Sequence, residues 1–126
     1  MHKNQEERSN KEFPKAFDDL MRERYGDANG KYDLSVVFNR VEGYSYEALR
    51  LMLRGRRRLT MEALEGVADA IGISPIYFRE YRLMWACAKG EQSPALGDLL
   101  YEVARDFDEG HKQGEESKAG PAETTS

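Results

Sequence analysis

Four arginines surround a single glycine in the stretch RGRRR, residues 54 to 58. A guanidinium group is planar and permanently charged, and its fork of N–H donors fits phosphate and carboxylate oxygens in pairs. A basic run is therefore either a solvated surface or a site for an anion, and its neighbours must discriminate between the two. We call Arg54, Arg56, Arg57 and Arg58 the arginine loop.

The other side chains that could do chemistry do not form a site. His2 and His111 lie in polar segments near the two ends of the chain, and Cys87 lies in an apolar helical pattern. They provide neither metal-ligand spacing nor a nucleophile with its base. We interpret Cys87 as a core or interface residue, with a redox-sensing thiol as the alternative. The sequence therefore predicts a protein that is not an enzyme and that has no metal or cofactor.

The overall composition restricts the class of protein. The chain has 126 residues, of which 40% are hydrophobic and 33% are charged, and its formal net charge is −4. This length suits one domain with tails. The single cysteine excludes an intramolecular disulfide, and no apolar run is long enough for a membrane span or a secretion signal. We therefore expect a cytoplasmic protein.

The charge is unevenly distributed along the chain. Residues 13 to 90 carry 13 basic and 11 acidic side chains, whereas residues 91 to 126 carry three basic and nine acidic ones. Residues 1 to 12 and 110 to 126 lack apolar periodicity, so they cannot bury enough surface to offset the entropy of ordering. We predict that both segments are disordered tails and that the second is an acidic one.

Apolar residues between the tails recur at helical spacing without strand alternation, which predicts an all-α protein. Five helices are expected in residues 13 to 90. Capping residues and glycines mark their boundaries: Pro14 and Gly26, Asp33 or Ser35 and Gly43, Ser45 and Gly55, Thr60 and Gly72, and Ser74 with Pro75. A C-terminal helix begins at Ser93–Pro94 within residues 91 to 109, and Gly97 destabilises it by roughly 1 kcal/mol relative to alanine.

The order of the second and third helices is that of a helix-turn-helix. Gly43, Tyr44, Ser45, Leu49, Gly55 and Thr60 precede MEALEGVADAIGI without a gap, and SPIYFREY follows. In these residues the chain resembles the Cro/CI-type (XRE) family of helix-turn-helix regulators. The resemblance implies a five-helix, lambda-repressor-like domain in residues 13 to 90.

The same resemblance implies that the partner is double-stranded DNA and that residues 45 to 54 form a recognition helix in the major groove. Ser45 would cap this helix. The positions where the family commonly meets base edges are Tyr46, Glu47 and Leu51, with Arg50 beside them. In the family, the loop that follows the glycine at the position of Gly55 commonly touches the DNA backbone. The resemblance therefore implies that the arginine loop holds phosphates.

Three of these side chains could each contact a particular base in the major groove. Glu47 could accept a hydrogen bond from cytosine N4, Arg50 could reach guanine O6 and N7, and Leu51 could touch a thymine methyl group. A carboxylate aimed at DNA repels phosphates unless it finds a donor, so Glu47 indicates either narrow specificity or no base reading. Two further departures from the family are Asn39, where alanine is usual, and the long link GDANGKYD, residues 26 to 33.

The C-terminal helix needs a partner for its apolar face, which comprises Leu96, Leu99, Leu100, Val103 and Phe107. The helix either folds back on the five-helix domain or pairs with its copy in a second subunit. We expect a homodimer, because a two-fold dimer reads two half-sites about 34 Å apart. The acidic tail is expected to compete for the arginines and weaken non-specific binding to DNA.

These features together predict a sequence-specific, DNA-binding transcriptional regulator that acts as a repressor. The alternative is a protein-interaction module, such as an antitoxin or adaptor, that uses Leu51, Tyr46 and the C-terminal helix to bind another protein. Neither a membrane nor a small-molecule ligand is indicated as a partner.

Overall fold

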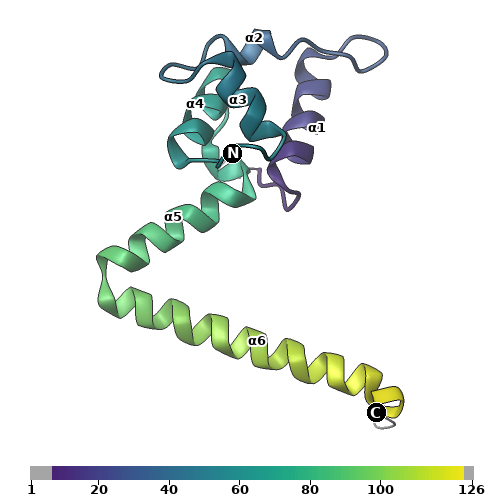
Figure 1. Cartoon of the computed structure of the whole chain (residues 1–126), viewed down its shortest axis with the longest axis vertical. Coiled ribbons are helices and arrows are strands. Elements are labelled where there is room, and N and C mark those ends of the chain that lie inside the picture. The colour runs from purple at the N-terminus through teal and green to yellow at the C-terminus, as the bar shows by residue number, and fades with distance from the viewer. Residues whose placement is uncertain (1–6, 124–126) are drawn as a thin grey trace. The chain divides into compact units, whose positions relative to one another are not determined.

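The computed structural model describes residues 7 to 123, with side chains described for residues 7 to 110. All regular structure in this part of the chain is helical, which confirms the all-α class. The elements are α1 (Phe13–Tyr25), α2 (Ser35–Phe38), α3 (Tyr46–Leu53), α4 (Met61–Ile71), the 3₁₀ helix η1 (Pro75–Tyr77), α5 (Arg79–Gln92) and α6 (Pro94–Glu123) (Figure 1). The chain divides into two compact units, Met1–Trp85 and Ala86–Ser126, which are described separately.

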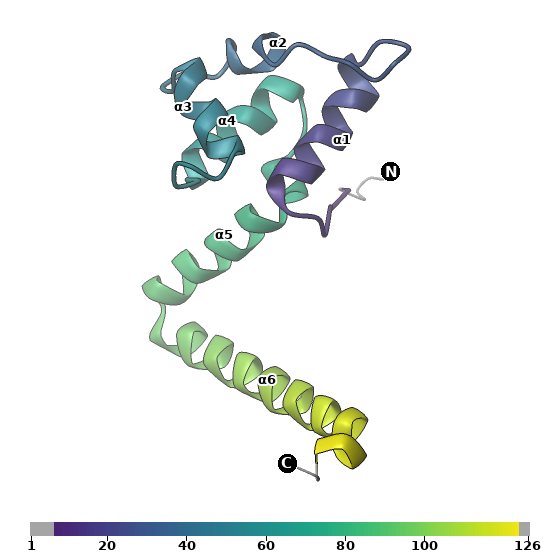
Figure 2. The same ribbon diagram turned by 45° about the vertical axis from the view of Figure 1, so that its right-hand side comes forward.

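One apolar core holds the first unit together. Figures 1 and 2 show α1 to α4 gathered around it, with the link between α1 and α2 looping away. Phe17 of α1 stacks against Phe38 of α2, with ring centroids 5.5 Å apart. Phe13 meets Phe78 edge-on at 5.0 Å. Fully burying an apolar side chain stabilises the fold by about 1.5–3 kcal/mol. These aromatic contacts therefore hold α1 against α2 and against Phe78, which lies between η1 and α5.

Hydroxyl caps begin α3, α4 and α6 where the sequence predicted them. Ser45 Oγ accepts a hydrogen bond from the backbone N–H three residues on, at 3.0 Å, and Thr60 Oγ1 does the same at 3.1 Å. Ser93 caps α6 in the same way, whereas Ser74 caps η1 by accepting the N–H two residues on, at 3.3 Å. Each cap satisfies an N–H that the helix leaves unpaired, which is worth about 1 kcal/mol.

Two other helix starts differ from the prediction. The N-cap residue of α2 is Leu34 and not Asp33 or Ser35, and its side chain makes no capping hydrogen bond. The single helix predicted from Ser74 is divided into η1 and α5, with Phe78 between them.

The second helix is shorter than the sequence predicted. The expected helix extends to Gly43, but α2 ends at Phe38. The N–H groups of Arg40 and Val41 instead bond to carbonyls three residues back, at 2.9 and 3.2 Å, which is a tighter turn. Asn39 is a poor helix former, and the tighter turn still buries Val41 in the core. The predicted inner face is therefore correct although the predicted helix is too long.

The prediction of disorder is wrong for the described parts of both predicted tails, which take part in regular contacts or in a helix. The N–H of Ser9 donates to the Tyr77 carbonyl at 2.9 Å, and Arg82 Nη2 donates to the Ser9 carbonyl at 3.0 Å.

At the other end, α6 continues to Glu123, whereas the sequence predicted disorder from residue 110. The glutamates, lysines and alanines of that segment favour a helix, but Gly114, Gly120 and Pro121 oppose it. What favours the extension is that a helix that has formed lengthens more easily than a new one begins. Residues 1 to 6 and 124 to 126 of the predicted tails lie outside the described residues.

Two glycines bring α5 and α6 together in the second unit. A Cβ on Gly97 would lie 3.0 Å from the Gly90 carbonyl oxygen, and a Cβ on Gly90 would lie 2.8 Å from Leu100 Cδ1. The sequence indicated only that Gly97 weakens its helix. Gly97 also has a packing role, because a side chain there would press on the backbone of Gly90, whereas a side chain at Gly90 would meet chiefly the movable end of Leu100.

The left-handed conformation of Gly55, with φ of 76°, ends α3 and begins the arginine loop. An alanine side chain would meet no neighbour there, but it would strain the backbone. We therefore expect Gly55→Ala to lower the free energy of unfolding by about 1 kcal/mol, measured by chemical denaturation followed by circular dichroism. Gly110→Ala is the control, because Gly110 is helical and has open space around it. An equal loss in both variants, or none at Gly55, would contradict the role assigned to that turn.

Candidate nucleic-acid interface

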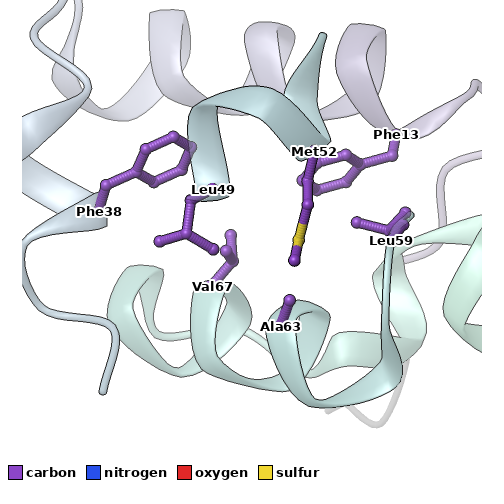
Figure 3. Close-up of a pocket in the computed structure, with 7 residues that line it drawn as sticks. All are labelled: Phe13, Phe38, Leu49, Met52, Leu59, Ala63 and Val67. Carbon is purple, nitrogen blue, oxygen red and sulfur yellow. The ribbon is translucent and has the colours of Figure 1, made fainter. Parts of the chain in front are cut away.

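The inner face of α3 is fixed in an apolar core. Ala48, Leu49 and Met52 are its buried residues. Figure 3 shows the side chains that surround the space beneath the helix: Phe13, Phe38, Leu49, Met52, Leu59, Ala63 and Val67. This space leaves no room for a water molecule, so it is packed core and not a ligand pocket.

The opposite face of α3 is polar and open to solvent. A helix turns about 100° per residue, so Glu47, Arg50 and Arg54 share one side of α3. We call these three residues the outer stripe. Glu47 and Arg54 are exposed and Arg50 is partly exposed. The predicted recognition residues therefore lie where a ligand from solvent could reach them.

Tyr46 and Leu51 lie at the two edges of the outer stripe. The Tyr46 ring meets Phe38 edge-on, with centroids 5.8 Å apart, and 37% of the residue is exposed. Leu51 is partly buried, and its carbonyl accepts the N–H of Arg56 at 2.8 Å. Both residues are therefore held by the fold and present only part of their surface outward.

An ion pair joins two residues of the outer stripe. Arg50 Nε donates to Glu47 Oε1 at 3.0 Å, and Arg50 Nη2 donates to Glu47 Oε2 at 2.7 Å. The hydrogen bond from Arg50 lowers the pKa of Glu47, and the charges of Arg50 and Arg54 act in the same direction. The Glu47 carboxylate thus finds its donor inside its own helix. The i, i+3 spacing was the signal from which this pair could have been predicted.

The arginine loop is exposed to solvent. All four of its residues are exposed, and none of the ion pairs formed by the described residues includes them. Adjacent like charges repel one another, and within residues 7 to 110 no carboxylate lies within ion-pair distance to offset that repulsion. This arrangement favours a ligand with several negative charges.

Both ends of the arginine loop are anchored. At its start, the N–H of Gly55 donates to the Met52 carbonyl at 3.1 Å. At its end, Leu59 packs against the core, and the hydroxyls of Tyr44 and Thr60 are hydrogen-bonded at 2.7 Å. The loop therefore keeps a defined position beside the end of α3.

Two other arginines have a structural role. Arg24 Nη1 donates to the carbonyl of Ile71 at 3.1 Å, and Arg40 Nη1 donates to that of Ala70 at 3.4 Å. These carbonyls lie at the C-terminal end of α4, where the helix dipole is negative and carbonyls lack helical partners. The sequence did not indicate this role. It distinguishes arginines that the fold uses from those of the arginine loop.

The long link between α1 and α2 closes on itself. Asp27 Oδ1 accepts hydrogen bonds from the N–H groups of Asn29 and Lys31, at 2.8 and 3.0 Å. Hydrogen bonds from these backbone groups lower the pKa of Asp27. The link is therefore a defined turn built on one aspartate.

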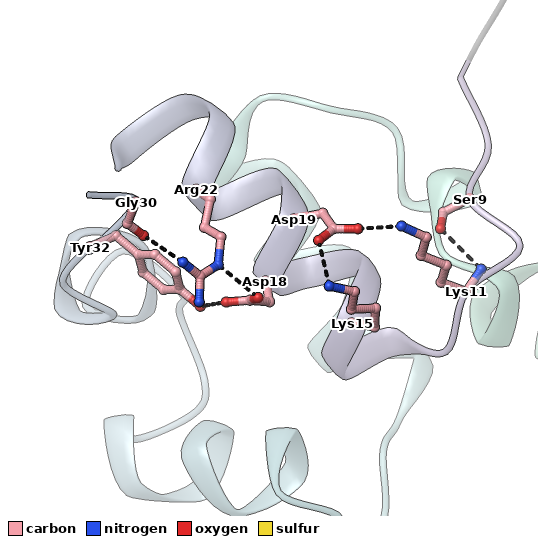
Figure 4. A network of polar contacts seen from close by, with 8 residues as sticks. All are labelled: Ser9, Lys11, Lys15, Asp18, Asp19, Arg22, Gly30 and Tyr32. Carbon is pink, nitrogen blue, oxygen red and sulfur yellow. Dashed lines mark hydrogen bonds and ion pairs between the residues drawn. The ribbon is translucent and has the colours of Figure 1, made fainter. Parts of the chain in front are cut away.

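Side chains of α1 anchor this link. Arg22 Nη1 donates to the Gly30 carbonyl at 3.1 Å, and Arg22 Nε donates to Asp18 at 2.9 Å (Figure 4). The Tyr32 hydroxyl donates to the other oxygen of Asp18 at 2.6 Å. Burial and the bond to Asp18 raise the pKa of Tyr32 to about 12. Arg22 and Tyr32 thus hold the link against α1.

The apolar face predicted for the C-terminal helix is only partly covered in the second unit. Leu99, Val103 and Phe107 are 58%, 58% and 73% exposed. Leu96 is partly buried, and Leu100, at 36% exposed, lies against Gly90 of α5. The first turns of this face are therefore partly covered within the chain, whereas its later turns are exposed.

Other kinds of site are not evident in the described residues. No three His, Cys, Asp or Glu side chains among them could together hold a metal ion. Cys87 is exposed, so its interpretation as a core residue is wrong. No described helix has a stretch long and apolar enough to cross a bilayer. Comparison of the chain with protein-family models, with curated proteins and with solved structures finds no match.

The raised pKa of Tyr32 predicts a loss of stability in alkali. Because the pKa in the folded state lies above the ordinary 10.0, the contribution of the neutral phenol is complete below pH 10 and disappears as the pH rises through about 12. The difference in unfolding free energy between the parent chain and Tyr32→Phe should therefore shrink over this range. Denaturation of both proteins at several pH values measures it, and a constant difference would contradict the raised pKa that burial and the bond to Asp18 give Tyr32.

Proposed function

We propose that this protein is a double-stranded DNA-binding transcriptional regulator of the helix-turn-helix type that acts as a repressor. In this proposal α2 and α3 form the helix-turn-helix, and the face of α3 that carries Tyr46, Glu47, Arg50 and Leu51 enters the major groove. The arginine loop binds phosphates beside the groove, which gives affinity through counterion release.

The observation that supports the proposal most strongly is the state of the arginine loop. Four exposed guanidinium groups follow directly on a helix with an open polar face, and no ion pair of the described residues neutralises them. A solvated charge run needs no fixed position, but this loop is anchored by Gly55 at one end and by Leu59 and Thr60 at the other. An anchored cluster of guanidinium forks suits the regular phosphate spacing of a duplex.

The proposed regulator needs a second copy of the chain to recognise a DNA site of sufficient length. One helix-turn-helix contacts only a few base pairs, whereas a two-fold dimer places two of them on half-sites about 34 Å apart. The exposed leucine and valine at positions 99 and 103 of α6 are suited to pair with the same face of a second α6. We therefore propose a homodimer joined through α6.

Charge reversal in the arginine loop tests the binding of DNA. The double variant Arg56→Glu with Arg58→Glu should lose measurable binding to any duplex in a gel-shift assay, because two phosphate contacts become repulsive. Arg57→Ala should reduce the slope of log affinity against log salt by about 0.9. The matched control is Arg8→Glu with Arg79→Glu, which makes the same change in net charge at exposed residues outside α3 and the arginine loop.

This experiment also separates the proposal from its rival. A protein-interaction module predicts that the parent chain binds no duplex at low or moderate salt. Equal losses from the two charge-reversed variants would mean that net charge alone attracts DNA, which would contradict the assigned interface.

Substitution on α6 tests the proposed dimer. Val103→Asp should convert a dimer into a monomer in analytical ultracentrifugation, because a carboxylate would be buried in an apolar interface. Tyr101→Asp is the control, since Tyr101 is similarly exposed but lies on the opposite face of α6, where Arg105 covers its ring at 5.9 Å. A parent chain that is monomeric, or two variants with equal effects, would contradict dimerisation through this face.

A further inference from the structure

The ion pair on α3 uses only one edge of the Arg50 guanidinium. The Nε–H and one N–H of Nη2 point at the two oxygens of Glu47, at 3.0 and 2.7 Å. A guanidinium has five N–H donors, so three are left. Two of these, one on Nη1 and one on Nη2, are parallel and lie at the end of the side chain. Glu47 therefore occupies the side edge of Arg50 and leaves the end edge for another pair of acceptors.

The end edge has a natural partner in the major groove. Guanine presents O6 and N7 there at the spacing that an arginine fork fits, and this pair distinguishes guanine from the other three bases. An unrestrained arginine loses much rotamer freedom when it binds a base. The two bonds to Glu47 fix the side chain beforehand, so less freedom is lost on binding.

The negative charge of Glu47 favours the ion pair with Arg50 over a direct contact between Glu47 and a base. Both of its oxygens already accept a charge-assisted hydrogen bond from Arg50. A contact with cytosine would direct the carboxylate at the groove, where the phosphates repel it. The pair with Arg50 neutralises the carboxylate and keeps it on the helix surface, where 60% of its side chain is exposed.

We propose that Glu47 is a positioning residue, which holds Arg50 so that the end edge of its guanidinium reads one guanine, and that Arg50 determines the specificity at that base pair. This inference rests on the proposed function, because it assigns roles within the same DNA interface. It names the class of target as a duplex site with a guanine facing the middle of α3.

A double-mutant cycle on DNA tests the two roles. The preferred duplex is first selected from random sequences with the full chain, and affinities are then measured for all four base pairs at each position. Arg50→Ala and Glu47→Ala should each reduce the preference for guanine at the same single position, by about fivefold to a hundredfold. The double variant should show no further loss, since Glu47 acts through Arg50.

The matched control is Glu62→Ala. Glu62 is exposed in the first turn of α4, as Glu47 is in the first turn of α3, and the change removes one negative charge. It should leave every base preference unchanged. A preference that survives Glu47→Ala would overturn the positioning role. A preference that Glu47→Ala still alters in the Arg50→Ala background would instead mean that Glu47 reads the cytosine itself.

A measurement without DNA distinguishes failure of this inference from failure of the proposed function. In the free chain, NMR titration should place the pKa of Glu47 below its usual value, and Arg50→Ala should raise that pKa. A normal pKa of Glu47 in a chain that binds DNA would overturn the inference alone. A chain with the lowered pKa but without salt-dependent duplex binding would overturn both.

Discussion

The contact between α3 and the core beneath it is the constraint on which the interface depends. Leu49 and Met52 lie on one side of an eight-residue helix and are almost completely buried. Because the helix period is fixed, their burial forces Glu47 and Arg50 to the opposite side. Deleting a buried side chain of this size costs about 2–5 kcal/mol, so the orientation of the outer stripe is set by the same energy that stabilises the domain.

The electrostatics of the chain separate two classes of arginine. Arg24 and Arg40 satisfy the carbonyls that end α4, and Arg22 holds the link between α1 and α2. These groups are already bound by the fold. The arginine loop has no such partner among the described residues. Its four adjacent cations repel one another, and bound phosphates would offset that repulsion. The fold thus uses Arg22, Arg24 and Arg40 for its own contacts and leaves the arginine loop without an ion-pair partner in the part of the chain that the structure describes.

Local features of this protein could be predicted from the sequence, because a cap or a left-handed turn depends on a few adjacent residues. Ser45, Thr60 and Gly55 were placed correctly for that reason. Contacts between distant segments left no local pattern. The N–H of Phe13 donates to Glu80 Oε2 at 2.9 Å, across 67 residues, and nothing in either segment indicates it. The pairing of Glu47 with Arg50 is intermediate, since the spacing allowed it but several other geometries were equally compatible with the sequence.

The most direct test of the account is the surface that a duplex covers on this protein in solution. NMR chemical-shift changes, recorded as a duplex is added at moderate salt, report that surface residue by residue. The account predicts the largest changes in the side-chain Nε–H signals of the arginine loop and in the first two turns of α3. Changes confined to α5 or α6, or their absence throughout α3, would contradict it.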